Sequence, residues 1–154
     1  MRRRVPFVPS PRDVVDKMLS LADPRPDELL VDLGSGDGRI VIAAARDYGC
    51  RALGVEINRE LVGYSRERIR RLGLRRARVV EGDLFRFDFS DADVVVLYLL
   101  PSVMEALRPR LLRLKRGARI VSHDYAVPGL EPDEVCVVRS QATGRRHVIY
   151  LYVM

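Results

Sequence analysis

The 154-residue chain is long enough for one folded domain, and its 47% hydrophobic residues can fill a core of ordinary size. No apolar run approaches the roughly 20 residues that cross a bilayer, and residues 1–4 are followed by a proline-interrupted stretch instead of a signal-peptide core. We therefore expect a cytoplasmic protein without membrane insertion. The net charge of +6, from 27 basic and 21 acidic residues, permits an acidic partner but does not require one.

Short apolar runs alternate with segments of helical periodicity along the chain, which predicts an α/β fold with a mainly parallel sheet covered on both faces. Strands are expected at residues 29–33, 52–56, 78–81, 94–98, 119–122, 135–139 and 148–153. Helices are expected near residues 10–22, 38–48, 58–72 and 102–114. We expect a crossover helix after each strand up to the fifth, and a hairpin with Gly144 in its turn for the last two strands.

The first helix has a start signal in residues 10–13. We expect Ser10 to be the N-cap, Pro11 to take the first helical position, and Asp13 to cap back toward Ser10.

The most informative stretch runs from an apolar strand into Gly34, Gly36 and Gly38 and then into a helix rich in Ile and Ala. Glycines allow the backbone to approach a ligand closely, and the amides of a helix N-terminus point at it. We therefore expect a nucleotide cofactor at this turn. A tight turn without a ligand is the alternative.

The charges at this turn indicate which cofactor binds. A dinucleotide fingerprint would need glycine where the chain has Arg39, and it would place a pyrophosphate beside Asp32 and Asp37, which repel an anion. S-adenosylmethionine has no phosphate and carries an ammonium and a sulfonium, which a carboxylate favours. The signs of charge therefore predict S-adenosyl-L-methionine as the cofactor.

Two acidic residues end the second and third strands at the same edge of the predicted sheet. Glu56 follows the glycine turn by about 20 residues, the usual spacing for a ribose-binding acid, although it could be a solvated strand end. Asp83 is a candidate for the adenine amino group, with Leu84 against the ring, although it could only cap a turn. Asn58 could cap the next helix.

The fourth and fifth strands end where the reactive methyl group is expected. Tyr98 and Pro101 stand there without the Asn-Pro-Pro-Tyr type of motif of adenine methylation or the Pro-Cys nucleophile of cytosine C5 methylation. Tyr98 could equally be a core aromatic. After the fifth strand, His123 and Asp124 are too few to hold a metal, so we expect substrate contact or local hydrogen bonds and no metal site. His147 is expected to be structural.

These residues together resemble the seven-strand, Rossmann-like methyltransferases over nearly the whole chain. Four stretches are more specifically similar to the archaeal broad-specificity protein lysine methyltransferases and to their relatives that methylate lysines of the mitochondrial ATP synthase c-subunit and the adenine nucleotide carrier: residues 6–11, 31–40, 98–101 and 121–124. The resemblance implies a single domain over residues 1–154, with residues 1–24 over the donor site and residues 25–154 as a doubly wound, seven-stranded core with an antiparallel C-terminal hairpin.

The resemblance also implies the donor-binding residues. Residues 6–11 would fold over the donor near its methyl group, although this chain has Phe7 and Ser10 where we expect the family to favour Tyr and Thr. The full expected set is Phe7, Pro9, Ser10, Asp32, Leu33, Gly34, Ser35, Gly36, Asp37, Glu56, Ile57, Asp83, Leu84 and Tyr98.

The expected reaction is methyl transfer to a neutral lysine amine of a protein, with Tyr98 and Asp124 orienting the amine. The sheet and its helices account for nearly all 154 residues, so we expect no lid and an acceptor that docks on an open face. RNA methylation, favoured by the arginine clusters, is one alternative, and a non-catalytic donor-binding module is another. A small-molecule methyltransferase would need a lid from the N-terminus or from a second subunit. We expect a monomer or weak oligomer.

Overall fold

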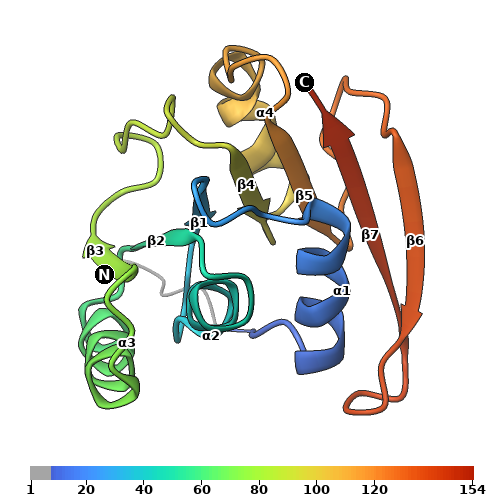
Figure 1. The fold of residues 1–154 in the computed structure, drawn as a ribbon. Coiled ribbons are helices and arrows are strands. Elements are labelled where there is room, and N and C mark those ends of the chain that lie inside the picture. The colour runs from blue at the N-terminus through green and yellow to red at the C-terminus, as the bar shows by residue number, and fades with distance from the viewer. Residues whose placement is uncertain (1–7) are drawn as a thin grey trace, which may run out of the picture.

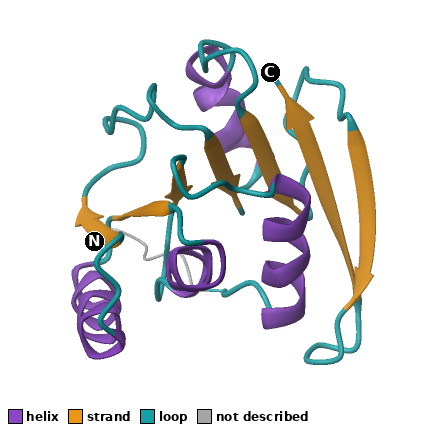
Figure 2. Cartoon of the chain, in the orientation of Figure 1, coloured by secondary structure: helices purple, strands orange, loops and turns teal. Residues whose placement is uncertain are grey.

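The computed structural model describes residues 8–154, which build one seven-stranded sheet with helices packed on it (Figures 1 and 2). The strands are β1 (Leu29–Leu33), β2 (Arg51–Glu56), β3 (Ala77–Glu81), β4 (Val94–Leu97), β5 (Arg119–His123), β6 (Glu134–Arg139) and β7 (Arg146–Val153). The helices are α1 (Arg12–Ala22), α2 (Arg39–Ala43), α3 (Arg59–Leu72) and α4 (Pro101–Leu111), and α2 continues into a π-helical turn, η1 (Ala44–Tyr48). Each predicted strand is present to within two residues of its expected bounds.

The strand order is β3-β2-β1-β4-β5-β7-β6. The first five strands in this order are parallel, whereas β7 runs antiparallel to both β5 and β6. The chain moves outward from β1 to β2 and β3 on one side and then returns to place β4 on the other side of β1. Ligands of open α/β sheets bind at such a switch point, outside the carboxyl ends of the strands.

Alternate side chains of the strands feed two separate cores, one on each face of the sheet. In β4, Val94 and Val96 pack with α1, α2 and α3, whereas Val95 and Leu97 pack with α4. This division follows the two-residue period of a strand, and it explains why a strand buried on both faces is continuously apolar. Figure 1 shows α4 behind the sheet and the other three helices in front of it.

The prediction of a crossover helix after every strand was wrong for the β3–β4 connection, since residues 82–93 contain no helix. This segment instead buries Phe89 against the α4 face of the sheet. Arg110 of α4 stacks over the Phe89 ring and donates hydrogen bonds to the carbonyl oxygens of Leu84, Phe85 and Phe87. The arginine satisfies backbone groups that a helix would have satisfied internally.

The predicted start of the first helix was also wrong by one residue. Helix α1 begins at Arg12, and Pro11 takes the N-cap position in an extended conformation. Ser10 does not cap, because its hydroxyl is hydrogen-bonded to His123 in β5. The Asp13 carboxylate does not cap back to Ser10, since it accepts hydrogen bonds from Ser140 and Gln141 in the β6–β7 turn.

The C-terminal hairpin is as predicted, with Gly144 at a positive φ in the turn. The hairpin is placed with β7 against β5 and β6 at the outer edge, which brings the turn of the hairpin beside the start of α1. Cys50 is buried, whereas Cys136 is only partly buried on β6. No helix among the described residues is long and apolar enough to span a membrane.

Candidate active site

The glycine turn lies at the carboxyl end of β1 and crosses the end of β2. Gly34 and Gly36 have φ values of 85° and 59°, a region that residues with a Cβ rarely occupy. The backbone N–H groups of Gly34 and Ser35 both donate to the carbonyl oxygen of Val55, at 2.8 and 3.0 Å. The turn is therefore fixed to the neighbouring strand and is not a free loop.

Gly54 in β2 is a residue of the site that the sequence did not reveal. A Cβ atom at this position would lie 2.5 Å from the Ser35 hydroxyl, so only glycine leaves room for the turn to pack on β2. The Ser35 hydroxyl is buried, and it has no hydrogen-bond partner among residues 8–154. A glycine inside a strand pattern is the signal that could have indicated such a close approach.

Three carboxylates gather at this edge, and Asp32 is the most deeply buried of them at 4% exposure. Its side chain has no hydrogen-bond partner within the described part of the chain. Burial raises the pKa of Asp32 well above its usual value, and the charges of Glu56 and Asp37 raise it further. An unpaired carboxyl group in this setting would gain free energy from a bound cationic group.

The other two carboxylates already hold the turn together. Burial raises the pKa of Asp37, but the hydrogen bonds and charge of Arg39, 2.6 Å away, outweigh burial and lower the pKa overall. Glu56 accepts hydrogen bonds from the backbone N–H groups of Gly36 and Asn58, both at 2.8 Å. Glu56 is therefore buried and is not the solvated strand end of the alternative interpretation, whereas Asn58 caps α3 as expected.

The remaining expected donor contacts lie around this edge. Asp83 accepts a hydrogen bond from the Phe85 N–H at 2.9 Å, so the turn-capping contact exists, and a role at the adenine stays a prediction. Leu84 packs against the α4-side core, whereas Ile57 is 64% exposed and free to cover a ligand. Leu33 is buried, Pro9 is exposed, and Phe7 lies outside the described residues.

These features fit S-adenosylmethionine. The unpaired Asp32 carboxyl group lies beside the glycine turn, and Glu56 adds a second carboxylate without a cationic partner among residues 8–154, whereas Asp37 is paired with Arg39. A donor with an ammonium and a sulfonium but no phosphate matches this charge, whereas a pyrophosphate does not. The expected donor contacts of Asp32, Gly34, Gly36 and Glu56 therefore remain a consistent set of predictions.

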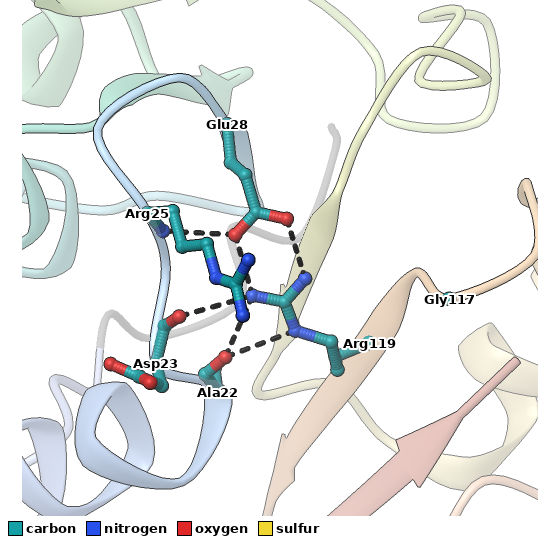
Figure 3. A pocket seen from close by; sticks show the side chains of 6 residues that line it. All are labelled: Ala22, Asp23, Arg25, Glu28, Gly117 and Arg119. Carbon is teal, nitrogen blue, oxygen red and sulfur yellow. Dashed lines mark hydrogen bonds and ion pairs between the residues drawn. The ribbon is translucent and has the colours of Figure 1, made fainter.

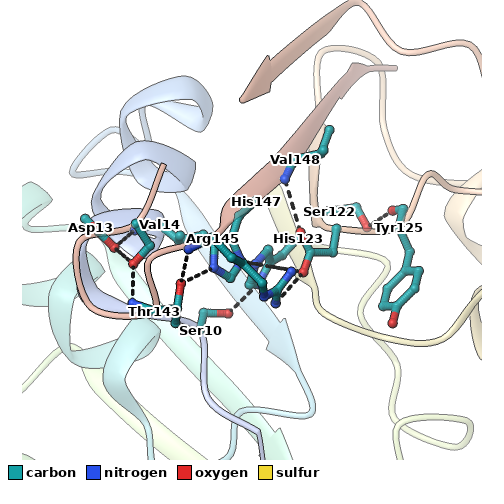
Figure 4. A network of polar contacts seen from close by, with 12 residues as sticks. Ser10, Asp13, Val14, Ser122, His123, Tyr125, Thr143, Arg145, His147 and Val148 are labelled. Carbon is teal, nitrogen blue, oxygen red and sulfur yellow. Dashed lines mark hydrogen bonds and ion pairs between the residues drawn. The ribbon is translucent and has the colours of Figure 1, made fainter. Parts of the chain in front are cut away.

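A second cluster lies at the ends of β4 and β5 (Figure 4). The Tyr98 ring lies against the His123 ring with centroids 4.0 Å apart. Nδ1 of His123 is 2.8 Å from the Ser10 hydroxyl, and Nε2 of His123 is 2.8 Å from Nδ1 of His147. Asp124, at a positive φ of 64°, places Oδ2 3.5 Å from the inner nitrogen of each histidine.

Burial and charge determine the protonation states in this second cluster. Burial lowers the pKa of His123 to about 4, against the attraction of Asp124, so the ring is neutral at pH 7. Burial and the charge of Asp124 raise the pKa of Tyr98, which therefore remains a phenol. Burial raises the pKa of Asp124, but the hydrogen bond from the Val148 N–H and the hydrogen bond and charge of Arg145 lower it overall.

The local hydrogen bonds expected of His123 and Asp124 are present, and the alternative of substrate contact stays a prediction. The sequence interpretation did not count His147 with these two residues, and His147 places a third potential ligand atom within 4.8 Å of theirs. His147 is hydrogen-bonded directly to His123, and the position of His147 in the sequence did not predict this contact.

A hollow at the opposite, amino-terminal edge of the sheet is a structural clamp (Figure 3). Arg119 of β5 binds both carboxylate oxygens of Glu28 at 2.7 Å and also donates to the carbonyl oxygens of Ala22 and Asp23 at the end of α1. Its donors are satisfied within the fold. The carboxyl edge is therefore the better candidate for the active site.

The comparisons with known proteins agree with this geometry. The family model described as the ANTKMT methyltransferase domain matches residues 32–134. A Protein-lysine N-methyltransferase of Saccharolobus islandicus is 42% identical over 97% of this chain and 94% of the relative. The lysine N-methyltransferase of the ATP synthase c-subunit from Mus musculus is 40% identical over 84% of this chain, which spans about half (52%) of the mouse protein.

Solved structures give the same fold. The crystal structure of an RNA methyltransferase from Salinibacter ruber in complex with S-adenosyl-L-homocysteine superimposes with a TM-score of 0.85 and 44% identity, covering 95% of this chain and 93% of that one. TrmN from Thermus thermophilus, at 23% identity and a TM-score of 0.75, shows the fold alone. The chain therefore belongs to the ANTKMT methyltransferase domain family and is an S-adenosylmethionine-dependent methyltransferase.

Proposed function

We propose that this methyltransferase transfers methyl groups to lysine side chains of proteins. The observation that carries the proposal is the 42% identity with a Protein-lysine N-methyltransferase that is matched along 94% of its length. Relatives named for lysines of the ATP synthase c-subunit and of the adenine nucleotide translocase, at 40% and 39% identity, support the same acceptor chemistry.

The donor would be held by Asp32, the backbone of the glycine turn and Glu56. Bound S-adenosylmethionine supplies an electrophilic methyl group on a positively charged sulfur. The protein positions this group, and its carboxyl edge compensates the positive charge of the donor. Asp32 would be ionised when it faces the donor ammonium, which offsets the cost of burying the carboxylate.

The acceptor amine would be oriented by Tyr98 and Asp124. A free lysine has a pKa of about 10.4, so a proton must leave before the nitrogen lone pair can attack. The phenol of Tyr98 can donate or accept a hydrogen bond at neutral pH. Asp124 already accepts from the Val148 N–H and from Arg145, so it would act through its remaining lone pairs.

RNA methylation is the second candidate, favoured by the similarity to the Salinibacter ruber structure, which is described as an RNA methyltransferase, and by the net positive charge. An RNA acceptor would bring binding that weakens steeply as salt rises. The cytoplasmic location and the monomeric or weakly oligomeric state expected from the sequence belong to the same proposal, and cell fractionation and light scattering test them.

The deciding experiment incubates the purified protein with methyl-labelled S-adenosylmethionine and a cell extract, and then treats the products with protease or ribonuclease. We expect label that protease alone releases and that maps to lysine, with Asp32→Ala as the blank. Label released by ribonuclease alone would overturn the proposal in favour of an RNA acceptor.

A further inference from the structure

The chain contains two histidines, and the fold brings both rings into direct contact. His123 is the last residue of β5, and His147 lies in β7, which pairs antiparallel with β5. Their side chains are 0% and 1% exposed. A buried imidazole pair lies next to Tyr98 at the acceptor side of the site, and its function is open.

The pair is the middle of an unbroken chain of four side chains (Figure 4). The Ser10 hydroxyl contacts Nδ1 of His123 at 2.8 Å, the two rings meet at 2.8 Å, and Nε2 of His147 contacts the Thr143 hydroxyl at 2.9 Å. Every ring nitrogen therefore has one partner. Ser10 is buried at one end, and Thr143 is exposed in the hairpin turn at the other.

Neutral rings can satisfy this chain in two ways. Either each group donates toward Thr143, or each donates toward Ser10, and the two arrangements differ only in the tautomers of the imidazoles. Burial keeps His123 neutral at pH 7, since its pKa is lowered to about 4. The charged and titratable groups that face the pair are Asp124, Arg145 and Tyr98.

The buried end of this hydrogen-bonded chain, at Ser10, adjoins the donor turn. The carbonyl oxygen of Ser10 accepts a hydrogen bond from Arg39 at 3.0 Å, and Arg39 is paired with Asp37 of the turn. On its other side, His123 is covered by the Tyr98 ring. This hydrogen-bonded chain thus runs from Ser10, whose backbone is linked through Arg39 to the donor turn, to the protein surface at Thr143.

We propose that Ser10, His123, His147 and Thr143 form a proton relay that carries the proton of the acceptor ammonium to solvent. The relay rests on the proposed lysine acceptor and adds a function to two residues that the sequence treated as structural or undecided. It needs no oxidant or metal, because only protons move along it.

Atoms and charge balance along the relay. The ammonium passes one proton to the Ser10 oxygen while the Ser10 proton moves to Nδ1 of His123. The Nε2 proton of His123 moves to Nδ1 of His147, the Nε2 proton of His147 moves to Thr143, and the Thr143 hydroxyl proton leaves to water. The neutral amine then forms the new carbon–nitrogen bond with its lone pair, and the electrons of the methyl–sulfur bond stay on sulfur.

A metal ion held by His123, His147 and Asp124 is the competing interpretation of the cluster. The hydrogen bonds argue against a metal site. The two inner ring nitrogens are already hydrogen-bonded to each other, and the Arg145 guanidinium lies 3.2 Å from the Asp124 carboxylate. A chelator arm in the experiment distinguishes the two interpretations.

The test uses His147→Asn in the full chain. The asparagine amide can replace Nδ1 toward His123 but cannot reach Thr143, so the relay is interrupted while the buried contact is kept. Thr143→Val interrupts the relay at its exposed end, where folding is least at risk, and Thr143→Ser restores the hydroxyl. Rates of methyl transfer to poly-L-lysine are measured from pH 7 to pH 10.

We expect His147→Asn to lower kcat about 10- to 100-fold at pH 7 with unchanged KM values for donor and acceptor. The deficit should shrink as the pH approaches the lysine pKa of about 10.4, where the amine is already neutral. Thr143→Val should show a deficit of the same pH dependence, and Thr143→Ser should recover the rate.

Equal rates of wild type and His147→Asn, or a deficit that is the same at every pH, would overturn the relay, since a structural role alone predicts the latter. Activity that a chelator abolishes and Zn²⁺ restores would overturn it in favour of a metal site. A wild-type protein that methylates neither extract protein nor poly-L-lysine would refute the proposed function itself, and the relay with it.

Discussion

At the scale of single residues, the buried carboxyl group of Asp32 lowers the stability of the ligand-free protein, and the proposed contact with the donor ammonium would make the same charge favour binding. Its pKa is raised in the fold, so the protonated form is favoured and the ionised form at pH 7 destabilises the ligand-free protein. Its neighbour Asp37 has a lowered pKa because of Arg39, and its ionised form therefore stabilises the fold. Two carboxylates five residues apart, one in β1 and one in the glycine turn, thus have opposite effects on the stability of the fold.

We predict that Asp32→Asn raises the Tm of the ligand-free protein at pH 7 by a few degrees, which corresponds to a gain in the free energy of unfolding on the order of 1 kcal/mol. The same substitution should weaken S-adenosylmethionine binding at least about 10-fold, because the donor ammonium loses its counter-charge. Thermal unfolding and calorimetric titration measure the two effects. Asp37→Asn is the matched control and should lower the Tm; a lower Tm for Asp32→Asn would contradict this account of the site.

At the scale of elements, Arg119 fastens the end of α1 to the sheet. The guanidinium and the Glu28 carboxylate are both mostly buried, with side chains 17% and 16% exposed, and the arginine also caps two carbonyl oxygens of α1. The hydrogen bond from Arg119 lowers the pKa of Glu28 to about 2. Helix α1 connects the Ser10–His123 contact at its start to this clamp at its end, so the clamp fixes the far end of the helix.

We predict that Arg119→Met destabilises the protein by about 3 kcal/mol, because it leaves the Glu28 carboxylate without its buried partner. Urea unfolding at pH 7 measures this loss. Arg119→Met together with Glu28→Gln should recover part of it, since no unpaired charge then remains. A single variant as stable as the wild type would exclude the clamp as a support of α1.

At the scale of the whole molecule, the buried His123 ring makes stability sensitive to acid. The pKa of His123 falls from 6.5 to about 4 on folding, so its contribution to stability is fully present above pH 6.5 and is lost as the pH falls toward 4. Asp32 acts in the opposite direction, because a raised carboxyl pKa adds stability as the pH falls. The contribution of Glu28 is lost only as the pH falls from 4.5 toward 2.

We predict that the free energy of unfolding of Asp32→Asn declines between pH 6.5 and pH 4, measured by urea unfolding in steps of half a pH unit. The Asp32→Asn substitution removes the carboxyl group whose titration would oppose the effect of His123. Adding His123→Gln should lower the stability at pH 7.5 and flatten the decline. An equally steep decline without His123 would assign the acid sensitivity to other groups.

The sequence by itself determined the fold and the glycine turn, because both depend on local patterns. Apolar strand runs, helical periodicity and the alternate glycines depend on residues close together in the chain, and the fold and the methyltransferase family were confirmed. The acids at the ends of β1 and β2 could be placed on one edge because parallel strands align their carboxyl ends.

Only the tertiary structure decided the contacts between distant segments. Ser10 pairs with His123 across 113 positions, so its hydroxyl is unavailable as a helix cap. His147 reaches His123 because β7 inserts between β5 and β6, an arrangement that periodicity does not encode. Gly54 is required by the Ser35 side chain, and Arg110 replaces a crossover helix. Each of these depends on packing, which brings together residues that no short-range pattern links.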